Sequence, residues 1–157
     1  MQGQDFENIG DETLFWYAPW PEQKSDGIRT AVWRRDRLGY FQAYSHGPLT
    51  DSEEEGPHIV SAPIDLEDQS ALLSLNINQP NEYCGVSVEI LDERFAPVEG
   101  YTHADCQPPS ESGFKQVVKW ADKTSIEGVS GRIRIRVDFT GIRFEDVHLY
   151  AVYLDLT

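Results

Sequence analysis

Long apolar runs are missing from this 157-residue sequence, and so is any surplus of basic residues. No stretch approaches the roughly 18 consecutive apolar residues that a membrane-spanning helix needs. The chain does not open with the basic and then apolar pattern of a signal peptide. These absences predict a protein that does not span a membrane. The opening residues 1–5 fit either a cytosolic protein or a domain excised from a secreted one.

Positive charge is scarce: acidic residues outnumber basic ones by 27 to 13, which gives a formal net charge of −14. Nucleic acids and anionic membranes present phosphate groups, and phosphate binding requires a positive surface. The composition therefore predicts that neither is a partner. The expected partner is neutral or cationic, or is an anion met by a local arginine patch.

Cysteine is scarce as well, with Cys84 and Cys106 as the only two in the sequence. One pair in a chain of this size is not a disulfide framework. A chain of 17.9 kDa is also large enough to bury a core without a disulfide or a metal. A disulfide and two free thiols are the alternatives, and free thiols are the simpler interpretation.

Helical periodicity is absent apart from one weak turn near residues 124–127, and alternating strand patterns take its place. In residues 132–139 every odd position is apolar and every even position is charged, which predicts a strand with one face in the core. Residues 85–100 predict a β-hairpin in which Ser87 and Glu89 face outward.

Further strands are expected at residues 12–18, 28–34, 40–44, 58–64, 72–78, 114–120 and 146–155. The first of these is apolar on both faces, so we expect it to be buried from both sides. Short strands separated by turn residues, without a long helix, predict an all-β fold: an antiparallel two-sheet β-sandwich, jelly-roll-like in its strand order. No repeat or linker divides the chain, which predicts one domain over residues 1–157. The residue pattern before residues 45–56 differs from that of the strands after them, so a domain boundary there is the alternative.

Several short motifs follow one another in a fixed order from about residue 27 to the end of the chain. They are residues 32–36, 86–92, 98–101, 105–106, 117–120, 132–137 and 149–150, which read VWRRD, VSVEILD, VEGY, DC, VVKW, RIRIRV and LY. In this order and spacing the chain resembles the β-sandwich domain that follows the five-bladed β-propeller in some secreted bacterial glycoside hydrolases and their relatives. It departs from that family at residues 37–40 and 144–148, where the family has Gly-Phe directly after the Asp and a short acidic turn.

The resemblance implies an accessory domain that is not catalytic, and that binds polysaccharide or oligosaccharide or braces a preceding propeller domain. Residues 12–20 are similar to the last blade of such a propeller, so residues 1–45 are expected to resemble that blade or to be contributed by it. The resemblance also implies an extracellular or periplasmic location within a larger secreted protein.

Aromatic side chains are the first candidates for sugar binding, because Trp and Tyr rings stack on the apolar faces of sugars. Trp20 lies between two prolines, and Tyr44 and Tyr101 lie at strand ends beside loops. These three are predicted to be exposed ligand-binding residues. Trp33 and Trp120 are in phase with apolar neighbours and are predicted to lie in the core.

Arginine is the candidate for holding an anionic glycan, because its guanidinium forks onto carboxylate or sulfate groups. Arg35 is one candidate, and Arg134 is another because it lies in a row of three arginines on one strand face. His103 joins them as a polar residue in the loop after Tyr101. Pairing of these arginines with acidic residues of the protein is the alternative, and a chain this acidic favours it.

Asp5, Glu7 and Asp155 are candidates for a structural calcium site, because carboxylate oxygens are ligands that calcium prefers. The three meet if the two termini are adjacent. The loop at residues 103–106 has no standard zinc-ligand spacing. A structural calcium ion is therefore the one metal or cofactor that we consider.

Carboxylates are so frequent that some pair falls by chance within the roughly 5–9.5 Å separation used by glycosidases. A general acid also needs a hydrophobic pocket, and the sequence places no acidic residue clearly in one. The sequence therefore predicts a non-catalytic accessory domain of a carbohydrate-active enzyme. A structural or protein-interaction β-sandwich without a sugar site is the alternative, and a small glycan-hydrolysing enzyme is the third interpretation.

Overall fold

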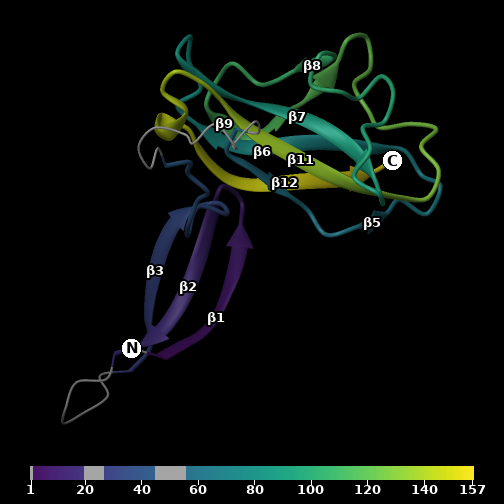
Figure 1. Cartoon of the computed structure of the whole chain (residues 1–157). Helices are drawn as coiled ribbons and strands as arrows, with labels where there is room; N and C mark the ends of the chain where they lie inside the picture. Colours follow the sequence, from purple (N-terminus) through teal and green to yellow (C-terminus); the bar gives the residue numbers. More distant parts are fainter. Residues whose placement is uncertain (1, 20–26, 45–55) are drawn as a thin grey trace. The chain divides into compact units, whose positions relative to one another are not determined.

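The computed structural model describes residues 2–19, 27–44 and 56–157, which form two compact units, Met1–Tyr40 and Phe41–Thr157 (Figure 1). Both units are all-β, and every strand pair is antiparallel. Within the described ranges, no helix has the length and apolar character required to cross a membrane. Two compact units can belong to one domain or to two, so a single domain over residues 1–157 stays a prediction.

A three-stranded sheet makes up the first unit, in the order β1 (Gln2–Ile9), β2 (Glu12–Ala18) and β3 (Arg29–Arg34). Gly10 adopts a φ of +57° in the two-residue turn between β1 and β2, a conformation that costs glycine little.

Two expectations for the first unit are wrong. Strand β1 is not among the strands expected from the sequence. Of the residues of β2, Thr13 alone is buried, although the strand is apolar enough to be predicted as buried on both faces. The reason is that the unit consists of one sheet, which has no second layer of its own to cover its faces.

Two larger sheets and a two-stranded sheet make up the second unit. Its elements are β4 (His58–Val60), β5 (Ile64–Asp65), β6 (Ala71–Asn78), β7 (Cys84–Asp92), β8 (Cys106–Gln107), β9 (Gly113–Val117), β10 (Lys119–Trp120), β11 (Arg132–Gly141), the 3-10 turn η1 (Phe144–Asp146) and β12 (His148–Leu156). In one sheet β11 is central, with β7 along one edge and β4 and β5 along the other. In the second sheet β6 lies between β12 and β9. Strands β8 and β10 form the small sheet.

One hydrophobic core lies between the two larger sheets (Figure 1). The alternation predicted for β11 is confirmed, because its apolar residues Ile133, Ile135, Val137 and Phe139 are all buried. Strands of both sheets contribute to the same core. The second unit is therefore an antiparallel two-sheet β-sandwich, as predicted, while its jelly-roll-like strand order stays a prediction.

The outer edge of β7 is closed by side chains and loop backbone. Ile90 N donates to Tyr101 O at 3.0 Å. Val88 N donates to the Cys106 thiol at 3.2 Å, and the indole Nε1 of Trp120 donates to Val88 O at 3.0 Å. These contacts satisfy backbone groups that an edge strand would otherwise expose.

The hairpin predicted over residues 85–100 is only partly formed. Its first arm is β7, and Phe95 N donates to Asp92 O at 3.1 Å in the turn that follows. The returning segment makes a single bridge between Leu91 and Pro97 and no second strand. A proline cannot donate to a ladder, which is consistent with the interruption there.

Candidate functional site

An open groove of about 470 Å³ lies at one end of the sandwich, where the β6–β7 turn, the loop after β8 and the end of β11 meet. Tyr83 lines this groove and is 49% exposed, and Glu82 beside it is exposed too. Ser110 and Thr140 add hydroxyl groups from the other two segments. The groove is thus lined by a tyrosine, a glutamate and two hydroxyl-bearing residues.

Hydrogen bonds hold the turn that carries Tyr83. Asn81 N donates to Cys84 O at 2.8 Å, and the Asn81 side-chain oxygen accepts from Tyr83 N at 2.8 Å. Tyr83 O in turn accepts from Arg143 N at 3.1 Å. The backbone of Tyr83 is therefore fixed without a ligand, which lowers the entropy lost on binding.

Gly141 brings the end of β11 against this turn. It adopts a φ of +93°, and a Cβ at this position would lie 2.2 Å from Tyr83 O. A larger residue would have to displace the turn, so glycine is required for the approach.

A second hollow of about 270 Å³ lies on the other side of Pro108, Pro109 and Ser110, which line both depressions. Its lining includes Gln107 and Gln116, whose amide nitrogens donate to Ala121 O at 3.0 Å and to Phe114 O at 3.4 Å. Amides bind the hydroxyls of sugars through either their oxygen or their NH₂ group. An extended ligand that lies across residues 108–110 would meet the Tyr83 ring at one end and amide groups at the other.

A third hollow, of about 520 Å³, opens between β12 and the sheet edge formed by β4 and β5. Its lining is apolar except for Ser61. Because a sugar needs several hydrogen-bonding partners, this hollow does not suit one.

A group of polar side chains lies on the outward face of β7 and β11, where the loop at residues 101–106 covers it. Ser87 Oγ lies 3.0 Å from His103 Nδ1. His103 Nε2 lies 3.0 Å from Asp138 Oδ2 and 3.4 Å from Glu89 Oε1. The expectation that Glu89 faces solvent is wrong, because the His103 side chain covers it and leaves it 7% exposed.

The serine, histidine and carboxylate of this group are the residue types of a hydrolytic triad, but their geometry does not favour acyl transfer. His103 Nε2 is buried and makes no hydrogen bond, so its approach to Asp138 is a close contact that lies off the N–H direction. Arg136 holds both Asp138 oxygens at 2.9 Å. The amide of Val88, next to Ser87, already donates to Cys106 and is not available for an oxyanion. The geometry instead fits a clamp that holds the loop on the sheet.

Both cysteines are free thiols, which decides between the two alternatives left by the sequence. The Cys84 thiol lies 3.2 Å from Gln79 O in the turn that leads to the groove. Burial raises the pKa of the Cys106 thiol, and its hydrogen bonds with Val88 N and Ser87 oppose that shift. Cys106 is thus held mainly in its neutral form at pH 7, where it serves as a hydrogen-bond acceptor.

Tyr101 is predicted to be an exposed binding residue, and that prediction is wrong. Its side chain is 2% exposed and meets the Trp120 ring edge-on, with 5.4 Å between ring centroids. Its hydroxyl accepts a hydrogen bond from Glu127 N at 2.8 Å. The backbone of Tyr101 lies along the edge of β7, which directs the ring into the core and leaves no face for a sugar.

The other predicted aromatics differ in outcome. Trp20 lies outside the described residues. Tyr44 is 66% exposed, as predicted. Trp120 is fully buried, as predicted, whereas Trp33 is 38% exposed because the single sheet of the first unit does not cover it.

The two predicted arginines have partners within the protein. Arg134 donates from Nη1 to Ser61 O at 3.1 Å, and its Cζ lies 4.3 Å from the centre of the Phe95 ring. Arg35 donates to Gly10 O at 3.1 Å and lies 3.8 Å from an oxygen of Asp36. Binding of an anionic glycan by either residue stays a prediction.

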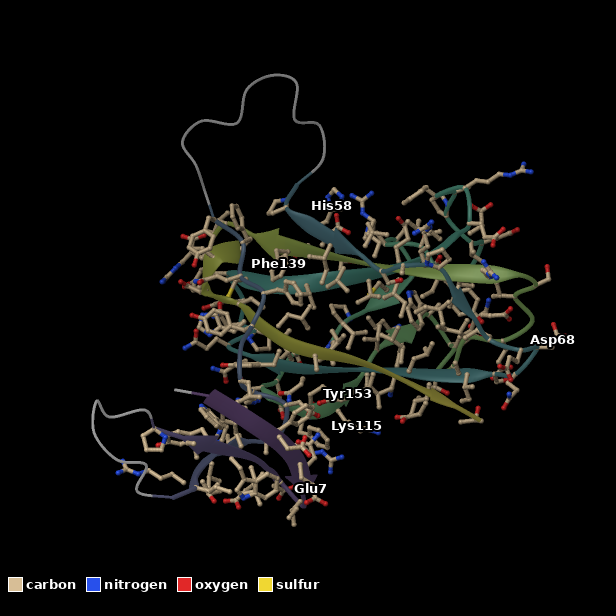
Figure 2. All side chains as sticks on the ribbon, turned by 90° about the horizontal axis from the view of Figure 1, so that it is seen from below. Glu7, His58, Asp68, Lys115, Phe139 and Tyr153 are labelled. Carbon is tan, nitrogen blue, oxygen red and sulfur yellow. The ribbon has the colours of Figure 1, made fainter. Side chains whose placement is uncertain are left out.

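The three carboxylates of the predicted calcium site are divided between the two units. Asp155 accepts hydrogen bonds from Lys115 Nζ at 2.8 and 2.9 Å, and Lys115 lies beside the Tyr153 ring (Figure 2). Asp5 and Glu7 belong to the first unit. Among the described residues, no group of three His, Cys, Asp or Glu side chains is arranged to hold a metal ion. The calcium site stays a prediction.

None of the predicted ligand-binding residues that the structure describes lines the two polar hollows. The groove instead depends on Tyr83 and Glu82, which the sequence marks only as the end of a turn between two strands. Comparison of the chain with protein-family models, with curated proteins and with solved structures finds no match.

Proposed function

We propose that the second unit binds a polysaccharide chain in the groove beside Tyr83 and across residues 108–110, as a non-catalytic accessory domain. The observation that carries this proposal is the exposed Tyr83 ring on a turn whose backbone is already fixed. An aromatic ring stacks on the apolar face of a sugar, and the neighbouring hydroxyls and carboxylate bind its OH groups. The resemblance of residues 27–157 to domains of secreted glycoside hydrolases supports the same function and an extracellular location.

The charge of the groove bears on the class of polysaccharide. Glu82 lines the first hollow, Glu111 and Lys119 line the second with opposite charges, and the whole chain carries a net charge of −14. An anionic glycan would be repelled, whereas a neutral or an amine-bearing glycan would not. We therefore expect neutral glucans, xylans and mannans and the cationic chitosan to be the ligands to test first.

Affinity gel electrophoresis against these polysaccharides tests the proposal, followed by calorimetry with the one that retards the protein. Tyr83→Ala should weaken binding about tenfold or more, which corresponds to a loss of about 1.4 kcal/mol. Phe95→Ala is the matched control, because Phe95 is an exposed aromatic at the opposite end of β7. The proposal is wrong if no polysaccharide retards the wild-type protein, or if Tyr83→Ala binds as well as Phe95→Ala.

A further inference from the structure

The three-stranded sheet of the first unit has two open edges, because no strand among the described residues pairs with the outer side of β1 or of β3. An open edge presents a row of backbone N–H and C=O groups to a further strand. Both edge strands also expose large apolar side chains: Phe6 and Ile9 of β1 are 58% and 54% exposed, and Val32 of β3 is 52% exposed. Backbone groups and apolar surface are thus available together on each edge.

The two edges carry opposite charges. The charged residues of β1 are Asp5 and Glu7, and those of β3 are Arg29 and Arg34. All four are exposed, and Figure 2 labels Glu7 on its strand. Charges on an edge usually prevent it from pairing with another sheet. That protection holds between edges of the same sign and fails between edges of opposite sign.

Charge therefore selects one of the ways in which two copies of this sheet can join. Pairing of β1 with β1 brings carboxylates together, and pairing of β3 with β3 brings guanidinium groups together; like charges on adjacent strands destabilise both. Pairing of β3 with β1 brings opposite charges together. When both copies turn the same face of the sheet to the same side, β3 of one copy and β1 of the next run parallel, because each is antiparallel to β2. Through Leu14, Glu7 lies level with Val32 across the sheet. In the parallel arrangement an offset of two residues, which keeps every side chain on its own face, places Glu7 next to Arg34, whereas Arg29 projects from the opposite face.

We propose that the first unit joins copies of this chain head to tail, with β3 of one copy added to the open edge of β1 in the next. After each contact of this kind, the assembly still has one unpaired β1 edge and one unpaired β3 edge. The assembly therefore grows into a ring or a chain and does not stop at a symmetric dimer. The proposal concerns a surface other than the groove, so it is independent of polysaccharide binding.

Sedimentation velocity of the full chain, at concentrations up to about 1 mM so that weak contacts are populated, tests the proposal. The wild-type protein should form species larger than a dimer as concentration rises. About 1 M salt should reduce them, because the Debye length then falls to about 3 Å. Reversing one edge, with Asp5→Lys and Glu7→Lys or with Arg29→Glu and Arg34→Glu, should leave a monomer.

The variant with all four substitutions is the decisive measurement. It exchanges two charges of each sign, so it keeps the net charge of −14 and restores opposite edges. It should regain the larger species. The control Glu99→Lys with Asp122→Lys makes the same charge change as the acidic-edge variant, but at exposed residues of the second unit, and should assemble as the wild type does. Circular dichroism checks that each variant is folded; where a reversed edge does not fold, the neutral pair Asp5→Asn and Glu7→Gln should weaken assembly at least tenfold.

Three results would overturn the proposal. One is a wild-type protein that stays monomeric over the whole concentration range. Another is a dimer that survives reversal of either edge, because the contact would then lie elsewhere. The third is a folded four-substitution variant that stays monomeric, because edges of opposite charge would then not be sufficient for assembly.

Discussion

Replacement of Trp120 by phenylalanine tests how much of the sandwich depends on one buried hydrogen bond at an edge strand. Trp120 is fully buried and donates from Nε1 to Val88 O at 3.0 Å, on the side of β7 that faces away from β11. Phenylalanine keeps an aromatic ring against Tyr101 but removes the donor. The Val88 carbonyl, itself buried, would then have neither water nor a protein partner.

The expected loss of stability has two parts. A buried carbonyl left without its hydrogen bond costs about 1–3 kcal/mol. The smaller ring leaves roughly 40 Å³ unfilled, which costs about 1 kcal/mol at the cavity coefficient known for buried side chains. We therefore expect Trp120→Phe to lower the free energy of unfolding by about 2–4 kcal/mol, a large share of the roughly 5–15 kcal/mol of a typical domain.

Urea unfolding followed by far-ultraviolet circular dichroism measures this loss. Trp33→Phe is the matched control, since it is the same chemical change at a residue that is 38% exposed, and it should shift stability by less than about 0.5 kcal/mol. The reasoning is refuted if Trp120→Phe unfolds at the same urea concentration as the wild type. A loss of equal size in both variants would also refute it, because burial would then not decide the effect.

Two other predictions concern Cys106 and Gly141. Burial raises the pKa of the Cys106 thiol, so its contribution to stability is complete below the ordinary thiol pKa and is lost as the pH rises through the higher folded-state value; Cys106→Ala should therefore flatten the fall in unfolding free energy above the ordinary thiol pKa of about 8.5. An equally steep fall in that variant would exclude Cys106 as the cause. Gly141→Ala should lower the thermal midpoint more than Gly128→Ala does, because both glycines have a positive φ but only at Gly141 would a Cβ strike Tyr83 O. Equal losses would show that the contact with the Tyr83 turn is unimportant.

The strands of the second unit can be recognised from the alternation of apolar and polar side chains in the sequence. Alternation in β11 is complete, so residues 132–139 predict both the strand and its buried face, and the structure confirms them. The same rule fails for Glu89, which has the right position to face solvent. His103, in a loop 14 residues later, covers Glu89. The alternation of side chains along a strand gives no information about which loop will lie over it.

Binding residues are harder to infer than strands, because a pattern shows where a side chain starts and does not show what lies over it. Tyr44 and Tyr101 both occur at strand ends beside loops. The first is 66% exposed and the second is 2% exposed. Tyr83 has the same local setting, and no sequence pattern distinguishes it from other turn residues, because the groove that it lines is completed by distant segments around Ser110 and Thr140.

The amino-acid sequence by itself determined the all-β class, the main strands of the sandwich and the acidic character of the chain. These depend on local period and on composition, which are properties of the chain whatever its conformation. Only the tertiary structure decided which edges are closed, which carboxylates are covered and which tyrosine lines a groove. Each of these results from contacts between residues far apart in the sequence, such as the indole of Trp120 on Val88 and the backbone of Gly141 against Tyr83.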